Sequence, residues 1–196
     1  MHPEAAALQP EPILKALLRN RVNCVIVGSF GAIAQGVDLE YTDIDLCIEM
    51  SAENIRATAA VLTELGAIEG TGDDIDDEGR SLIVAAIARD PEFIHTRQTS
   101  WVFLTPYGEV DLVMKPEGFP RGYEDLTDEG ASGVMYAQIE DIRRSKELAG
   151  RDKDLAALKK FPPPSVHRTV QPLPDTDELA LRARRSSGYR GPHIGI

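Results

Sequence analysis

Cysteine, histidine and long apolar runs are all scarce in this chain of 196 residues. Two cysteines and four scattered histidines exclude a Cys/His zinc site of any known spacing. No apolar run approaches the roughly 18–20 residues that span a bilayer, and the N-terminus (MHPE) lacks the basic region and apolar core that we would expect of a signal peptide. We therefore expect a cytoplasmic protein with no membrane contact, in which Cys24 and Cys47 are reduced thiols buried in apolar strands.

Charge is divided unevenly along the chain. Residues 1–140 hold 9 Lys/Arg and 25 Asp/Glu, a net charge of −16, whereas residues 141–196 hold 12 and 7, a net charge of +5. An acidic body repels polyanions over a Debye length of roughly 8 Å, while a basic C-terminal part attracts them locally. Composition therefore argues against a general nucleic-acid coat and allows a small, directed contact with nucleic acid.

Helical and strand patterns alternate over residues 10–114 and are followed by a helical part, which predicts an α/β or α+β domain. We expect a small mixed sheet flanked by helices over residues 1–161, and a flexible tail over residues 162–196 that begins with three prolines. The patterns predict helices at 10–19, 30–35, 52–65, 139–148 and 152–160, and strands at 22–27, 43–49, 101–105 and 109–114. Residues 81–88 fit either a helix or a strand, 70–79 form an acidic loop, and 116–132 form a connector with one helical turn.

Three carboxylates occupy polar positions in two predicted strands whose residues alternate between apolar and polar. Asp43 and Asp45 occupy the polar face of one strand, and Asp111 has the same place on another. Residues i and i+2 of a strand lie about 6–7 Å apart on one face, which lets two carboxylates converge on the short ligand bonds of Mg²⁺. If the two strands are neighbours, all three carboxylates repel one another unless a cation is present. This pattern favours a divalent metal site.

Gly28 and Ser29 stand between a strand and a helix. Glycine lets the backbone approach a ligand closely, and the start of a helix offers free N–H groups and a positive dipole end to a phosphate. Ser29 adds a hydroxyl group. The pair alone is a weak signal, because any turn between a strand and a helix favours these two residue types.

The combination is more specific. Residues 27–32 (VGSFGA), 43–45 (DID) and 108–113 (GEVDLV) together resemble the active-site signature of the DNA polymerase beta-type nucleotidyltransferase superfamily. Residues 139–154 are similar to the Lys-x4-Arg-x2-Asp helix pair of the AbiEii-like and MenT-like nucleotidyltransferase toxins of toxin–antitoxin systems. The resemblance covers about residues 20–160 and implies the minimal nucleotidyltransferase fold.

The resemblance also implies roles for the site residues. Asp43, Asp45 and Asp111 would bind two Mg²⁺ ions, with Asp111 helping to deprotonate the attacking hydroxyl. A second group, Gly28, Ser29, Lys146 and Asp154, would bind the nucleoside triphosphate substrate. Lys146 would neutralise phosphate charge as pyrophosphate leaves. Two readings stay open in this group: Arg151 either contacts the nucleotide or pairs with Asp154 across one helical turn, and Asp154 either contacts the nucleotide or orients Lys146.

Several functions are compatible with these residues. We favour an enzyme that transfers a nucleoside monophosphate to an RNA (tRNA) 3′ end, as a toxin with an antitoxin protein as its partner. A protein side chain or a small molecule such as an aminoglycoside is an alternative acceptor, and the acidic body suits the cationic antibiotic. A non-catalytic antitoxin or regulator with the same fold is a second class of function. A third reading treats the carboxylates as ordinary surface charge.

Overall fold

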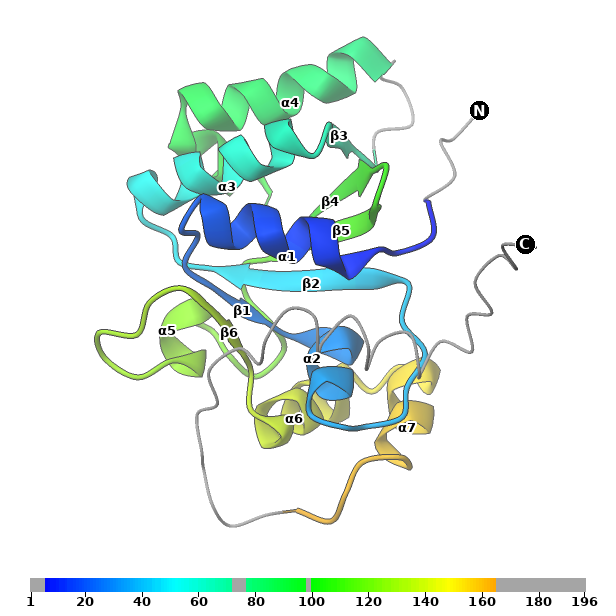
Figure 1. The fold of residues 1–196 in the computed structure, drawn as a ribbon. Helices are drawn as coiled ribbons and strands as arrows, with labels where there is room; N and C mark the ends of the chain where they lie inside the picture. Colours follow the sequence, from blue (N-terminus) through cyan, green and yellow to red (C-terminus); the bar gives the residue numbers. More distant parts are fainter. Residues whose placement is uncertain (1–5, 72–76, 98–99, 165–196) are drawn as a thin grey trace, which may run out of the picture.

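A six-stranded mixed sheet organises the molecule, whose computed structural model describes residues 6–71, 77–97 and 100–164 (Figure 1). The strand order is β3-β4-β5-β2-β1-β6. The strands are β1 (Cys24–Ile26), β2 (Asp43–Ile48), β3 (Ile68–Glu69), β4 (Ser100–Thr105), β5 (Gly108–Val113) and β6 (Val134–Tyr136). Within the sheet, β2 pairs with β5 and β1 with β6 in parallel, and the other neighbours are antiparallel. The predicted class, a mixed α/β domain with helices around a small sheet, is confirmed.

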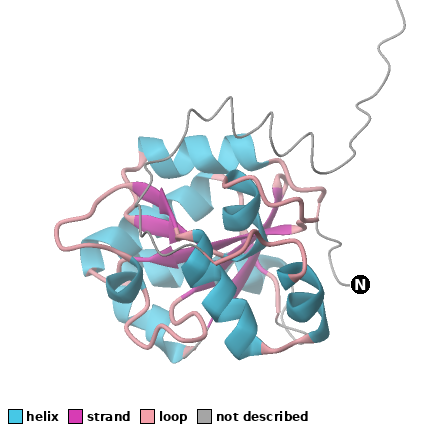
Figure 2. Cartoon of the chain, turned by 90° about the horizontal axis from the view of Figure 1, so that it is seen from below, coloured by secondary structure: helices cyan, strands magenta, loops and turns pink. Residues whose placement is uncertain are grey.

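Helices cover both faces of this sheet (Figures 1 and 2). One layer contains α1 (Pro10–Arg19), α3 (Ala52–Glu64) and α4 (Asp77–Arg89), followed by the short 3₁₀ helix η1 (Pro91–Thr96). The other layer contains α2 (Gly28–Ala34), α5 (Tyr123–Leu126), α6 (Ile139–Ala149) and α7 (Asp152–Leu158). No helix among the described residues is long and apolar enough to cross a membrane.

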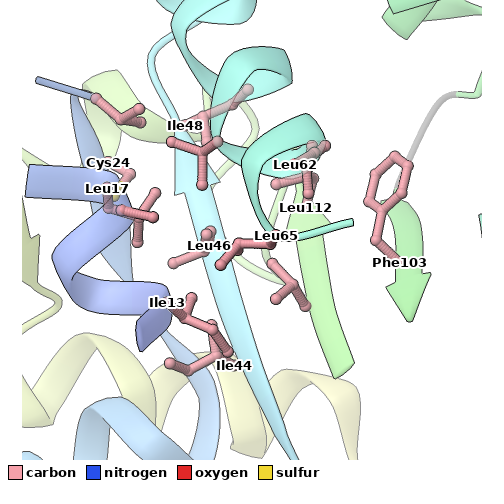
Figure 3. Packing of buried hydrophobic residues seen from close by; sticks show 14 of the residues in the cluster. Ile13, Leu17, Cys24, Ile44, Leu46, Ile48, Leu62, Leu65, Phe103 and Leu112 are labelled. Carbon is pink, nitrogen blue, oxygen red and sulfur yellow. The ribbon is translucent and has the colours of Figure 1, made fainter. Parts of the chain in front are cut away.

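The alternation along β2 separates the hydrophobic core from the carboxylates. Ile44, Leu46 and Ile48 are buried under α1 and α3, in the larger of two core clusters (Figure 3). Asp43 and Asp45 point to the opposite face, where Cys47 is buried in the second cluster. Burying an aliphatic side chain stabilises a fold by about 1.5–3 kcal/mol. A one-residue slip of β2 would therefore expose this core and bury the carboxylates, so the core fixes their position.

Most predicted helices and strands are present, and the capping residue and glycines expected at the helix ends are found there. Ser51 caps α3, its Oγ accepting a hydrogen bond from the Asn54 N–H at 3.3 Å, and Gly66 follows the helix with a φ of 65°. The hairpin of β4 and β5 is confirmed, and Gly150, with a φ of 61°, separates α6 from α7. Cys24 and Cys47 are both buried free thiols, as predicted.

Four expectations about the elements need correction or completion. The first is α2, which begins at Gly28 rather than at residue 30, because the positive φ of Gly28 turns the chain directly from β1 into the helix. Residues 81–88 are helical and belong to α4, which packs on α3. The 70–79 segment is not all loop, since α4 already begins at Asp77. Sequence patterns missed β3, β6 and η1, of which the two strands are only two and three residues long.

The C-terminal tail lies largely outside the described residues. The last helix among the described residues is α7, and residues 162–164 are neither helix nor strand, as their three prolines predict. The predicted domain boundary at residue 161 stays a prediction, because residues 165–196 are not described.

Candidate active site

The predicted carboxylates meet on two neighbouring strands. In the parallel register of β2 and β5, Asp43 is paired with Glu109 and Asp45 with Asp111. One carboxylate oxygen from each of Asp43, Asp45 and Asp111 lies within 4.8 Å of the other two. All three side chains are half-buried. The alternation of each strand could be read from the sequence, but the pairing that joins the strands could not.

Repulsion and burial disfavour the charged form of this cluster. Burial, and then the charge of Asp43, raise the pKa of Asp45 to about 6, although the charge of Lys146 opposes them. Burial also raises the pKa of Asp111 to about 8, with further contributions from Asp45 and Glu109. A bound cation would relieve this repulsion and favour the ionised carboxylates.

Asp111 provides a separate indication that the cluster suits a cation. Its Oδ1 atom is buried and, within the part of the chain that the structure describes, has no hydrogen-bond partner. A buried polar atom without a partner is destabilising, and such atoms are rare in folded proteins. Carboxylate oxygens are the ligands that Mg²⁺ prefers. The three Asp residues therefore fit a hard divalent cation in both donor chemistry and arrangement.

Gly28 holds the turn between β1 and α2 against the cluster. Its φ is 64°, and a Cβ atom built on it would lie 1.7 Å from Oδ2 of Asp45. The adjacent Val27 N–H donates a hydrogen bond of 3.0 Å to the Asp45 carbonyl oxygen. Only glycine can occupy this position without displacing the carboxylate, so the turn and the Asp pair depend on one another.

Lys146 connects the turn to the C-terminal helices. Its Nζ atom on α6 lies 3.3 Å from Oγ of Ser29 on α2 and 3.1 Å from Oδ1 of Asp154 on α7. The side chain of Lys146 is only 11% exposed. The left-handed residue Gly150 turns the chain between α6 and α7. The structure therefore brings Ser29, Lys146 and Asp154 together, although 117 positions separate Ser29 from Lys146.

Asp154 is a buried carboxylate between two cations. It is 1% exposed, and its Oδ2 atom accepts a hydrogen bond of 2.5 Å from Nε of Arg151. Burial raises the pKa of Asp154, but the hydrogen bonds from Arg151 and Lys146 outweigh this effect and hold the pKa below its usual value. The pairing of Arg151 with Asp154 is confirmed. Asp154 also contacts Lys146, as expected of a residue that orients it.

One cleft of about 900 Å³ is lined by the cluster and by the Lys146 network. Sequence reasoning did not single out two of the lysines that also line it, Lys115 and Lys160. Lys153 lines it too, and its charge opposes the raised pKa of both Asp45 and Asp111. The cleft also has an apolar part. Its larger apolar side chains are Leu39, Tyr41, Phe119, Leu126 and Ile142.

Two arginines that are close to Lys146 in sequence, Arg143 and Arg144, lie away from the cleft. The Arg143 guanidinium lies over the Phe161 ring at 5.3 Å and pairs with Glu140. The Arg144 guanidinium lies over the Phe119 ring at 5.4 Å. Neither lines the cleft. Although both arginines are close to Lys146 in sequence, they point to other sides of α6.

Comparisons of the chain with protein-family models, curated proteins and solved structures find no match. A function must therefore be argued from the residues of the cleft.

Proposed function

We propose that this chain is a metal-dependent nucleotidyltransferase, which transfers a nucleoside monophosphate from a nucleoside triphosphate to an acceptor hydroxyl. The observation that carries the proposal is the convergence of two groups on one cleft. One is the three-carboxylate cluster with its unpartnered Asp111 oxygen. The other is the contact of Lys146 with Ser29 beside the Gly28 turn. A cation site next to a phosphate site is what this reaction requires.

Asp43, Asp45 and Asp111 would hold Mg²⁺, and the motif resemblance implies two ions. Bound there, the metal would supply charge stabilisation to the attacking and leaving oxygens of an in-line displacement. The three Asp residues would position it on the sheet face. Gly28 supports this role, because its missing side chain leaves Asp45 in place.

Ser29 and Lys146 would bind the phosphates of the nucleotide. The Ser29 hydroxyl can donate to a phosphate oxygen, and the Lys146 ammonium is a compact charge that neutralises the leaving pyrophosphate. Asp154 would act as a positioning residue, because it contacts the Lys146 Nζ atom from the buried side. A lysine held at two points loses less side-chain entropy when it binds a phosphate.

The transfer step requires a proton acceptor. The acceptor oxygen attacks the α-phosphorus, the bond to the oxygen that bridges the α- and β-phosphorus breaks, and pyrophosphate leaves. Asp111 would take the proton of the attacking hydroxyl, because its carboxylate lies at the cluster and its Oδ1 atom has no protein partner among the described residues.

An RNA 3′ end is the acceptor that we propose. Lys115, Lys153 and Lys160 line the cleft and can follow an RNA backbone. The net charge of +5 over residues 141–196 acts in the same direction. A role as a toxin with an antitoxin partner rests on the resemblance of residues 139–154 alone.

The test is to incubate the full-length protein with each α-labelled NTP, Mg²⁺ and total RNA. We expect label on RNA together with pyrophosphate release, and loss of both in Asp45→Asn. Label on a small molecule would agree with the proposed transfer reaction but overturn the assignment of RNA as its acceptor. If none of the four NTPs released pyrophosphate in the presence of RNA or lysate, the proposed nucleotidyltransferase activity would be overturned.

A further inference from the structure

An apolar strip of sheet surface lies directly beside Asp111. In the antiparallel register, Asp111 is paired with Val102, Glu109 with Leu104, and Leu104 with Ile68. Paired residues share a sheet face. Ile68, Val102 and Leu104 are therefore on the face of the carboxylate cluster, and we refer to these three residues as the apolar shelf. They are half-buried and belong to neither core cluster.

Acidic groups border the apolar shelf. Glu109 lies between Leu104 and Asp43 in the sheet register, and Glu40 and Glu117 line the adjoining cleft. Lys153 is the cation whose charge acts on Glu109. A surface that combines apolar and acidic groups is complementary to an aromatic side chain flanked by arginines.

Residues 182–190 of this chain (RARRSSGYR) have that chemistry. The segment holds four arginines, no acidic residue, and one aromatic residue, Tyr189, which also carries a hydroxyl. The described chain ends at Pro164, four residues after the cleft-lining Lys160. Tyr189 follows 25 residues later. A fully extended chain of that length spans about 80–90 Å. The segment can therefore return to the cleft of its own molecule.

We propose, building on the nucleotidyltransferase function above, that the chain modifies its own Tyr189. The Tyr189 phenol oxygen attacks the α-phosphorus of a bound NTP, and a phosphodiester bond to the tyrosine forms. The bond to the oxygen that bridges the α- and β-phosphorus breaks, pyrophosphate leaves, and the phenol proton passes to Asp111. The Tyr189 ring packs on the apolar shelf, and the neighbouring arginines pair with Glu109 and the other acidic groups.

Tyr189 is favoured over Ser186 and Ser187 for two physical reasons. An aromatic ring buries far more apolar surface on the shelf than a serine side chain does. A phenol, with a pKa near 10, also gives up its proton more readily than an aliphatic hydroxyl does. Tethering adds to both effects, because it presents the segment at an effective concentration of roughly millimolar.

The experiment uses the full-length protein with α-labelled NTPs and Mg²⁺ and without RNA. We expect label on the protein in a denaturing gel, and an intact mass increased by one nucleoside monophosphate. Tyr189→Phe should abolish the label, whereas the matched control Ser186→Ala/Ser187→Ala should keep it. Arg184→Ala/Arg185→Ala should slow labelling by about 1.4-fold to fivefold for each exposed ion pair lost. The fraction labelled at early times should not depend on protein concentration, as expected for a reaction within one molecule.

Parallel reactions with RNA distinguish this inference from the proposed function. Label on RNA with an unlabelled protein would overturn self-modification and leave the nucleotidyltransferase in place. Label that persists in Tyr189→Phe would overturn the assignment of the acceptor. Neither label nor pyrophosphate release with any NTP would overturn both proposals.

Discussion

Gly28 and the carboxylate of Asp45 occupy adjoining space, so that a Cβ atom on Gly28 would lie 1.7 Å from Asp45 Oδ2. The glycine turn and the strand that carries the Asp pair are 17 positions apart in sequence, yet neither can change without the other. The glycine turn and the two Asp residues that follow it in sequence therefore pack against each other as one structural unit.

This relationship predicts the effect of Gly28→Ala. The variant should lose Mg²⁺ binding and nucleotidyl transfer, because the new methyl group displaces the Asp45 carboxylate. Gly36→Ala is a matched control, since Gly36 also has a positive φ, of 92°, but a Cβ atom there has no neighbour within 4 Å. Both variants carry a backbone cost of roughly 1–2 kcal/mol. Thermal melts and transfer assays check this, and equal activity in the two variants would contradict it.

The raised pKa values predict how stability depends on pH in the absence of metal. Asp111 has a pKa of about 8 in the folded chain, whereas an unperturbed Asp has a pKa near 3.8. The folded state then binds more protons than the unfolded state between these values, so stability falls as the pH rises through that window. Relative to Asp111→Asn, the wild type should lose at least about 1 kcal/mol between pH 5 and pH 8. Denaturant unfolding in a chelator at both pH values measures the difference, and parallel profiles would exclude a raised pKa.

Magnesium should stabilise the folded chain through the same carboxylates. A ligand that binds only the folded state adds about 2.7 kcal/mol at 100 times its Kd. We expect the melting temperature to rise with Mg²⁺ in the wild type and to stay constant in Asp45→Asn. Without metal, Asp45→Asn should be as stable as the wild type or more so, because repulsion with Asp43 is removed. A large loss of metal-free stability would instead mark Asp45 as a structural residue.

Lys146 and Asp154 should differ in how they affect turnover. Lys146→Ala removes the proposed phosphate contact and should lower kcat by about 10²-fold or more, with partial recovery in Lys146→Arg. Asp154→Asn keeps the shape of the side chain but weakens its hold on Lys146, so a smaller loss of about tenfold is expected. A positioning role requires that Asp154→Asn have no further effect in the Lys146→Ala background. Additive losses in a double-mutant cycle would contradict it.

The parts of the site that sequence could predict are those encoded by local patterns. The alternation of Asp43 and Asp45 with apolar residues fixed their sheet face, and Gly150 marked the division between α6 and α7. Strand pairing depends on contacts distant in sequence, so nothing local showed that Asp45 lies beside Asp111. Lys115 and Lys160 follow the motifs at 108–113 and 139–154 by only a few residues, but no local pattern showed that they line the cleft. The short strands β3 and β6 were missed because two or three residues cannot show an alternation.

The proposed RNA contact predicts a shallow salt dependence. Each phosphate that a lysine neutralises on single-stranded RNA contributes about −0.7 to the slope of log affinity against log salt. Besides Lys146, three lysines line the cleft, Lys115, Lys153 and Lys160, so we expect a slope of about −2 from these three. Lys153→Gln/Lys160→Gln should reduce its magnitude by about 1.4 and keep stabilisation by Mg²⁺, because neither lysine is one of the three carboxylates, and loss of the positive charge of Lys153 beside Asp45 and Asp111 does not disfavour a cation there. Fluorescence anisotropy with a labelled RNA 3′ end between about 50 and 200 mM salt gives both slopes. An unchanged slope in the double variant would place the RNA elsewhere on the molecule.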